Sequence, residues 1–169
     1  MKIILLSMLL SFHLYVFGQP LGMTIKDAEK KGITIQHLDS IYKSAAHADS
    51  TKAVFKSQPE QQELLKAYTQ LLSDFGDYLH KNKFTWNRPT RCWNRIYFDS
   101  TGSIDYFLYN FLTKDVKPED QVPLHRQAEF NRLLNLFIKA YKFPLKANTK
   151  FAQCSPVTYM PNEKRPNEQ

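Results

Sequence analysis

A chain of 169 residues, 43% of them hydrophobic, is long enough for one folded domain with its own core and needs no second one. Its 23 Lys and Arg residues outnumber its 16 Asp and Glu residues, and the formal net charge of +7 favours anionic partners. The chain has two cysteines and neither a C-x-x-C nor an H-x-x-x-H pair, which argues against a zinc site.

The first 18 residues have the pattern of a secretory signal peptide. Lys2 supplies the positive start, the apolar stretch Ile3–Phe17 follows it, and Val16 and Gly18 are small enough to precede a cleavage site. The stretch is shorter than the about 20 residues of a membrane-spanning helix, so cleavage is favoured over a retained anchor. We therefore expect a periplasmic or secreted protein that begins near Gln19 and has no membrane-spanning segment.

Residues 19–91 are predicted to be helical. Thr24 and Asp27 resemble a capping pair for a first short helix, which Gly32 is suited to end. Thr34 is placed to cap a second helix, whose apolar residues follow helical spacing.

The clearest helix begins at Ser57. Ser57 and Glu60 form the S-x-x-E capping box. Apolar residues then recur at steps of three and four, at Leu64, Tyr68, Leu71, Phe75 and Tyr78. This pattern predicts an amphipathic helix that runs to about His80 and buries its apolar face.

A β-hairpin is predicted over residues 93–111. Two runs rich in aromatic residues, 93–98 and 104–111, have the composition of strands. The segment Asp99–Gly102 between them is a turn sequence, because Asp suits the first turn position and Gly can adopt a positive φ.

A second amphipathic helix is expected from about Leu124 to Phe143, where Pro144 ends it. A last strand is expected over residues 151–159, and Pro156 predicts that it lies at a sheet edge. Residues 161–169 are predicted to be a disordered tail.

These elements predict a single α+β domain over residues 19–160. Its first part, 19–91, is expected to be helical, and its second part, 92–160, to follow the order hairpin, helix, strand. The fold class is therefore a small antiparallel sheet, made of the hairpin and an edge strand, on which amphipathic helices pack.

The two cysteines, Cys92 and Cys154, are predicted to form a disulfide. Export would place them in an oxidising compartment, where a lone pair of cysteines most simply forms one bond. The alternative is a catalytic thiol, which would require the second cysteine to stay reduced outside the cytoplasm.

A run of basic and aromatic residues is the strongest candidate for a ligand site. Its members are Arg88, Arg91, Trp93, Arg95 and Tyr97. On a strand, Trp93, Arg95 and Tyr97 share one face, where aromatic rings stack on a ligand and arginines hold an anionic group. The alternative is that these rings only pack against neighbouring strands.

Two stretches without acidic residues, 78–98 and 130–162, carry ten Lys and Arg residues between them. If the fold brings them together, they form one basic surface that attracts an anionic envelope component, such as a glycolipid head group, or an acidic protein partner. Binding to such a surface weakens as salt rises. Nucleic acid is not expected as a partner of an exported protein.

The sequence contains no G-x-S-x-G, P-loop or H-E-x-x-H motif, and its histidines stand in no known catalytic pattern. No catalytic residue, metal site or cofactor is therefore predicted. The sequence favours a binding or protein-interaction module whose ligand it does not identify. An exported enzyme of an unrecognised family is the alternative.

The order hairpin, helix, strand in residues 93–160 resembles the TonB C-terminal domain. Phe98–Ile104 is similar to that family's first hairpin, Ala140–Pro144 to its helix end and Pro156–Tyr159 to its closing strand. The resemblance implies a β-edge that recruits an extended peptide, and antiparallel pairing of the strands that carry the two cysteines. The family's proline-rich spacer is missing from residues 19–91, so its role in energy transduction is not implied.

Overall fold

The computed structural model describes residues 19–161, and the predicted signal peptide and residues 162–169 of the predicted tail lie outside them. The described chain forms four α-helices and a five-stranded sheet. In chain order the elements are β1 (Leu21–Thr24), α1 (Ile25–Lys30), α2 (Ile35–Ile41), β2 (Lys43–Ser44), η1 (Ser50–Lys52), α3 (Gln58–Lys81), β3 (Thr90–Phe98), β4 (Ile104–Phe111), η2 (Pro118–Asp120), α4 (Leu124–Ala140) and β5 (Phe151–Tyr159).

The sheet has the strand order β1-β4-β3-β5-β2. β3 pairs antiparallel with β4 and with β5, as predicted for the hairpin and the last strand. β1 and β2 pair in parallel with β4 and β5, so the sheet is mixed and the prediction of a purely antiparallel sheet is wrong. The α+β class itself is confirmed. β1 and β2 come from the segment predicted to be helical, and they are too short to show strand periodicity.

The predicted helix caps are present. The hydroxyls of Thr24, Thr34 and Ser57 each accept a hydrogen bond from the backbone N–H three residues further along. Glu60 completes the capping box by accepting from the N–H of Ser57 at 2.8 Å. Because these contacts are local, the helix starts follow directly from the sequence.

The turn between β3 and β4 packs against the end of α4. Gly102 has a φ of +87°, and a Cβ placed there would overlap the carbonyl oxygen of Phe143. The N–H of Phe143 donates to the carbonyl of Gly102 at 2.9 Å, and Lys142 forms an isolated antiparallel β-bridge with Ser103. α4 ends at Ala140, three residues before the predicted end, because Tyr141 is already extended and the residues after it pair with the turn.

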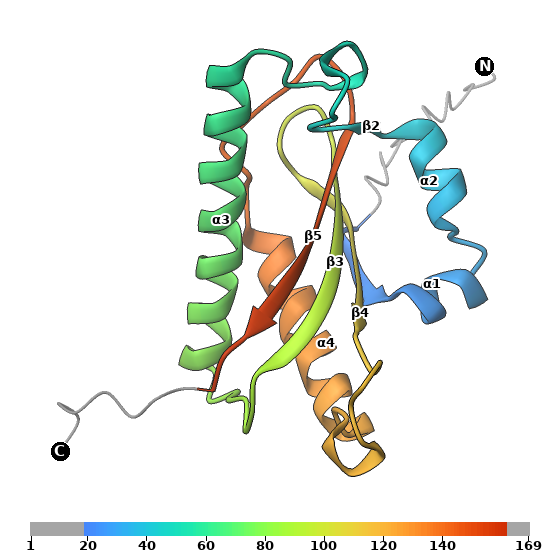
Figure 1. The fold of residues 1–169 in the computed structure, drawn as a ribbon, viewed down its shortest axis with the longest axis vertical. Coiled ribbons are helices and arrows are strands. Elements are labelled where there is room, and N and C mark those ends of the chain that lie inside the picture. The colour runs from blue at the N-terminus through green and yellow to red at the C-terminus, as the bar shows by residue number, and fades with distance from the viewer. Residues whose placement is uncertain (1–18, 162–169) are drawn as a thin grey trace, which may run out of the picture.

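Helices cover both faces of the sheet (Figure 1). α3 and α4 pack on the face that we call the α3/α4 face, where Ile96 and Phe98 of β3 join the larger core cluster. α1 and α2 lie on the opposite α1/α2 face, where Tyr97 joins a smaller cluster with Leu38. Neighbouring residues of β3 therefore serve two separate cores, as the alternation of side chains along a strand requires.

The predicted disulfide is wrong, and both cysteines are free thiols. The register of β3 and β5 places Cys92 opposite Val157 and Cys154 opposite Arg95. Residues directly opposite one another share a face, so Cys92 lies on the α3/α4 face and Cys154 on the other. Cys154 also lies three residues along β5 from Val157, the partner of Cys92. This offset of about 10 Å exceeds the Cα separation of a disulfide.

We expect Ellman titration of the unfolded, unreduced protein to find two thiols per chain. In the folded protein, iodoacetamide should modify the half-buried Cys154 first. Cys92 should react only after unfolding, since it is fully buried and burial raises the pKa of its thiol to about 12. The variant Cys154→Ser should abolish labelling of the folded protein. An intramolecular disulfide between Cys92 and Cys154 would contradict this register.

Candidate functional site

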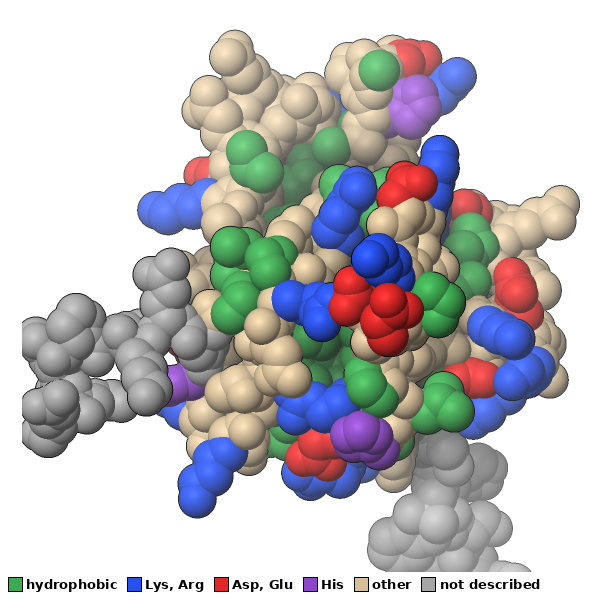
Figure 2. Space-filling view, turned by 60° about the horizontal axis from the view of Figure 1, so that its bottom comes forward, with side chains coloured by type: hydrophobic (Ala, Val, Ile, Leu, Met, Phe, Trp, Pro, Cys, Tyr) green, Lys and Arg blue, Asp and Glu red, His purple; other side chains and the backbone are tan. Residues whose placement is uncertain are grey.

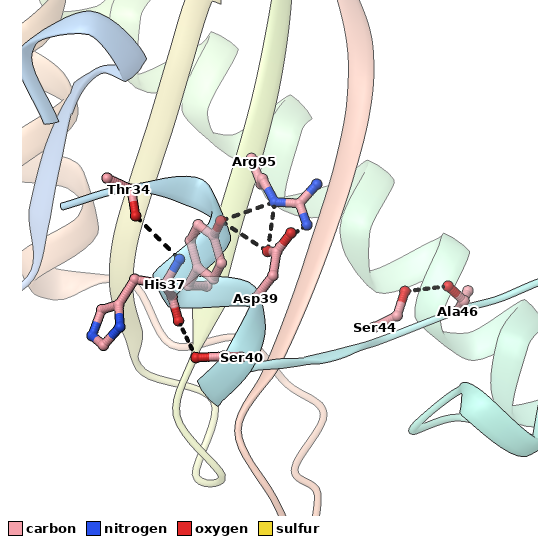
Figure 3. A network of polar contacts seen from close by, with 8 residues as sticks. Thr34, His37, Asp39, Ser40, Ser44, Ala46 and Arg95 are labelled. Carbon is pink, nitrogen blue, oxygen red and sulfur yellow. Dashed lines mark hydrogen bonds and ion pairs between the residues drawn. The ribbon is translucent and has the colours of Figure 1, made fainter. Parts of the chain in front are cut away.

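Arg95, one of the predicted ligand residues, points toward Asp39 of α2 (Figure 3), and Tyr97, another of them, contacts both residues. The hydroxyl of Tyr97 donates to Asp39 Oδ1 at 3.2 Å and accepts from Arg95 Nε at 2.9 Å. Arg95 Nη2 lies 2.5 Å from the same Asp39 oxygen. These contacts hold α2 on the sheet, so the polar atoms of Arg95 and Tyr97 already have partners inside the protein. Tyr97 is fully buried, so for this residue the alternative of packing within the protein holds, and not the binding of a ligand.

The remaining predicted ligand residues lie at the end of the sheet that α1 and α2 leave open. Arg88 forms an ion pair with Asp120, which compensates its charge. Arg91 is exposed and forms no salt bridge within residues 19–161. Trp93 is half-buried and stands opposite the exposed Pro156 of β5. Arg91 and Trp93 are thus the predicted residues that are most available to a partner.

Acidic and basic side chains mix at this end of the molecule (Figure 2). A cavity of about 250 Å³ lies here between the start of β3 and the start of α4, and Arg88, Asp120, His125 and Arg126 line it. The Arg126 guanidinium stacks 4.0 Å from the ring centre of Phe84 and donates to a backbone carbonyl. Because basic groups here meet acidic ones, this end does not carry the continuous basic surface predicted from the two acid-free stretches.

β5 leaves most of its outer edge without a neighbouring strand. β2 pairs only with Phe151 and Ala152, at the start of β5. From Gln153 to Tyr159, β3 is the only partner of β5 in the described part of the chain. β5 stands in front of β3 and β4 in Figure 1, with this edge toward the viewer. We call residues 153–159 the open edge.

The direction of the backbone groups along the open edge follows from the bonds to β2. The N–H groups of Lys43 and Ala45 donate to the carbonyls of Lys150 and Ala152, at 3.1 and 2.8 Å. Backbone groups of alternate residues in a strand point the same way. The even-numbered residues that follow therefore also point outward; these are Cys154, Pro156 and Thr158.

Outward-pointing backbone groups are the groups that an added strand binds. Pro156 has no N–H, so the open edge offers two backbone donors, at Cys154 and Thr158. The Cys154 carbonyl accepts one weak contact, at 3.3 Å, from the side chain of Gln153. The prediction that Pro156 lies at an edge is confirmed in this part of β5.

α3 borders the open edge on the α3/α4 face. The hydroxyls of Tyr68 and Ser155 lie 3.1 Å apart and connect the helix to β5. Leu65 and Leu72 are three and four residues from Tyr68 and so share its side of the helix. Leu65 is 66% exposed. Together with the half-buried Val157 of β5, these leucines form an apolar border beside the open edge.

The largest pKa shifts belong to buried side chains of the core. Burial raises the pKa of Cys92 and of several tyrosines, including Tyr109 and Tyr159, which are core residues. Shifts of this kind are expected from desolvation alone and do not mark a catalytic pair. Among the described residues, no three His, Cys, Asp or Glu side chains gather as a metal site would need. Within residues 19–161, none of the helices combines the length and apolar character of a membrane crossing.

Comparisons with the models of known protein families, with curated proteins and with solved structures find no match to this chain. They neither support nor contradict the similarity of residues 93–160 to the TonB C-terminal domain, which stays a prediction. A functional hypothesis therefore has to rest on the geometry of the described residues.

Proposed function

We propose that this protein is an exported interaction module that binds an extended segment of a protein partner as an added strand on the open edge. The observation that carries the proposal is the run 153–159, whose outward backbone groups have no strand beside them in the described part of the chain. Strand addition takes its affinity from main-chain hydrogen bonds and its specificity from alternate side chains. The similarity to the TonB C-terminal domain implies the same mode of binding independently.

The surroundings of the open edge suggest the chemistry of the partner. On the α3/α4 face, an added strand would place alternate side chains beside Leu65, Leu72 and Val157, which favours apolar residues. On the other face it would lie near Thr158, whose neighbour on β3 is Arg91, which forms no salt bridge among the described residues. That arginine and the formal net charge of +7 favour acidic residues there. The partner segment would thus alternate apolar and acidic residues.

Pro156 limits the strength of this pairing. Because it lacks an N–H, an added strand receives donors only from Cys154 and Thr158, which are four positions apart. Proline on an edge strand is also a common protection against uncontrolled edge-to-edge aggregation. Both effects favour a reversible contact of modest affinity over a permanent assembly.

Hydrogen exchange tests the proposal directly. In the free protein, the amides of Cys154 and Thr158 should exchange about a hundredfold faster than those of Ser155 and Val157, which bond to β3. The probe is a library of seven-residue peptides that alternate apolar and acidic residues. A binding peptide should protect the Cys154 and Thr158 amides and leave the others unchanged.

The variant Thr158→Pro removes one outward backbone donor. It should weaken peptide binding about tenfold, because one hydrogen bond is lost and the proline ring clashes with the backbone of the added strand. Thr158→Val keeps the N–H and is the matched control, so it should bind as the unmodified protein does. The proposal fails if no peptide of the library protects these amides, or if Thr158→Pro binds as well as its control.

A further inference from the structure

A second cavity lies at the opposite end of the sheet from the cavity near Arg88. It has a volume of about 640 Å³ and opens between β2, the segment 51–56 that precedes α3, and the loop 146–149 that precedes β5. Lysines from all three walls line it, and we call it the lysine cavity: Lys43, Lys52, Lys56 and Lys146. Three of the four lie outside the acid-free stretches, so the sequence did not indicate them.

The charges of the lysine cavity are largely uncompensated. Lys43, Lys56 and Lys146 form no salt bridge within residues 19–161, and Lys52 pairs only with the exposed Asp49, at 3.7 Å. Like charges that converge on one cavity repel, and a bound anion relieves that repulsion.

Among the described residues, Glu60 is the one acidic residue in the lining of the lysine cavity. Its Oε2 accepts from the backbone N–H groups of Lys56 and Ser57 and from the Ser57 hydroxyl, at 2.8–3.0 Å. Hydrogen bonds from the backbone and hydroxyl of Ser57 lower the pKa of this carboxyl. Glu60 therefore keeps its negative charge, which also attracts Lys56, and against four lysines it leaves the lining with an excess of positive charge.

Backbone hydrogen bonds hold the walls of the lysine cavity in place. The N–H groups of Val54 and Phe55 donate to the chain at β2, at 2.9 and 3.0 Å. On the other wall, the N–H of Ala147 donates to Ser100 in the turn between β3 and β4, at 3.0 Å. A ligand therefore has to order only lysine side chains, which lowers the entropic cost of binding.

From these observations we infer that the lysine cavity binds a compact ligand that carries two or more phosphoryl groups. Lysine ammonium groups bind phosphate as point charges, and their origin on three separate walls suits several anionic groups better than one. Thr51, Asn148 and Thr149 add neutral polar groups to the lining, which suit hydroxyls of a carbohydrate. The phosphoryl groups can belong to a free molecule or to a lipid head group.

The experiment uses the full mature chain and two probes. The free probe is inositol hexakisphosphate, measured by calorimetry, and the lipid probe is a phosphatidylcholine vesicle that contains phosphatidylinositol bisphosphate, whose head group carries more than one phosphoryl group. We expect the double variant Lys56→Gln, Lys146→Gln to weaken binding at least tenfold. Lys114→Gln, Lys139→Gln is the matched control, because it removes the same charge from exposed lysines elsewhere. It should change binding less than twofold.

Each outcome decides the inference. Binding of the free probe that the double variant weakens supports a soluble phosphorylated ligand, and the same result for vesicles alone supports a lipid head group. An equal loss of affinity in the double variant and in its control would show attraction by net charge only and would overturn the inference. The inference would also be overturned if the protein bound neither probe. The inference is separate from the proposed function: Thr158→Pro should leave phosphate binding unchanged, and the lysine variants should leave peptide binding unchanged.

Discussion

Replacing Phe130 with alanine is expected to lower the free energy of unfolding by about 3–5 kcal/mol. Phe130 lies in α4 and is fully buried. Its ring centre lies 5.0–6.0 Å from those of six aromatic residues: Phe75, Phe84, Trp86, Tyr109, Phe111 and Tyr159. These residues come from four parts of the chain: α3, the segment that precedes β3, strand β4 and strand β5. The loss of the Phe130 ring therefore leaves a cavity where these four parts meet.

Urea denaturation followed by circular dichroism measures this loss. Leu136→Ala is the matched control, because Leu136 lies on the same helix with 45% of its surface exposed. Its effect should stay within about 0.5 kcal/mol, as is usual for surface positions. A loss below about 1.5 kcal/mol for Phe130→Ala would mean that the aromatic cluster is less closely packed than the structure describes.

The protein is expected to unfold cooperatively between about pH 10 and pH 12. Five of the tyrosines within residues 19–161 are buried: Tyr42, Tyr68, Tyr97, Tyr109 and Tyr159. Burial raises the pKa of each of them, to about 12 for Tyr68 and Tyr97, from the usual value near 10. The folded state therefore keeps phenolic protons that the unfolded state releases.

The sign of the effect follows from this difference in bound protons. Since the folded pKa values lie above the unfolded ones, their contribution to stability is complete below pH 10 and is lost as the pH rises toward 12. Each buried tyrosine lowers the free energy of unfolding by about 1.4 kcal/mol per pH unit in that range, or about 7 kcal/mol for five. The free energy of unfolding of a domain is typically about 5–15 kcal/mol, so a rise of one to two pH units above pH 10 is enough to unfold the protein.

In an alkaline titration, the phenolate absorbance of the five buried tyrosines should appear together with the loss of far-UV circular dichroism. Tyr109→Phe is the informative variant, because the Tyr109 hydroxyl makes only a 3.4 Å contact with Asn131. It should move the midpoint to higher pH and reduce the proton release by one, with a stability change at neutral pH within about 1 kcal/mol. Ionisation of these five tyrosines near pH 10 with the fold intact would contradict the burial of their side chains.

The open edge and the lysine cavity lie on either side of β2. Strand addition at Cys154 and Thr158 begins where the pairing of β2 with β5 ends, at Ala152. The lysine cavity is lined by Lys43 of β2 and by the segment 51–56 that hydrogen-bonds to β2 from the outside. The two binding modes would therefore not compete for the same backbone groups, and each can be tested while the other is intact.

The sequence by itself determined the elements whose energies are local. The S-x-x-E box at Ser57 predicts the start of α3, and the structure shows both reciprocal hydrogen bonds of that box. The turn sequence that ends in Gly102 predicts the hairpin of β3 and β4, and β5 covers 151–159 as expected. Caps, turns and amphipathic periods depend on residues within about one or two turns of chain, so they can be recognised without the fold.

Only the tertiary structure decided which of these elements meet. β1 and β2 are strands because β4 and β5 lie beside them, and their own sequences carry no strand pattern. The register of β3 and β5 separates Cys92 from Cys154, since a shift of one residue moves a side chain to the other face. The pairing of Asp39 with Arg95 and the convergence of four lysines likewise join residues far apart in the chain. Such contacts depend on the packing of the whole domain, which no local pattern of residues encodes.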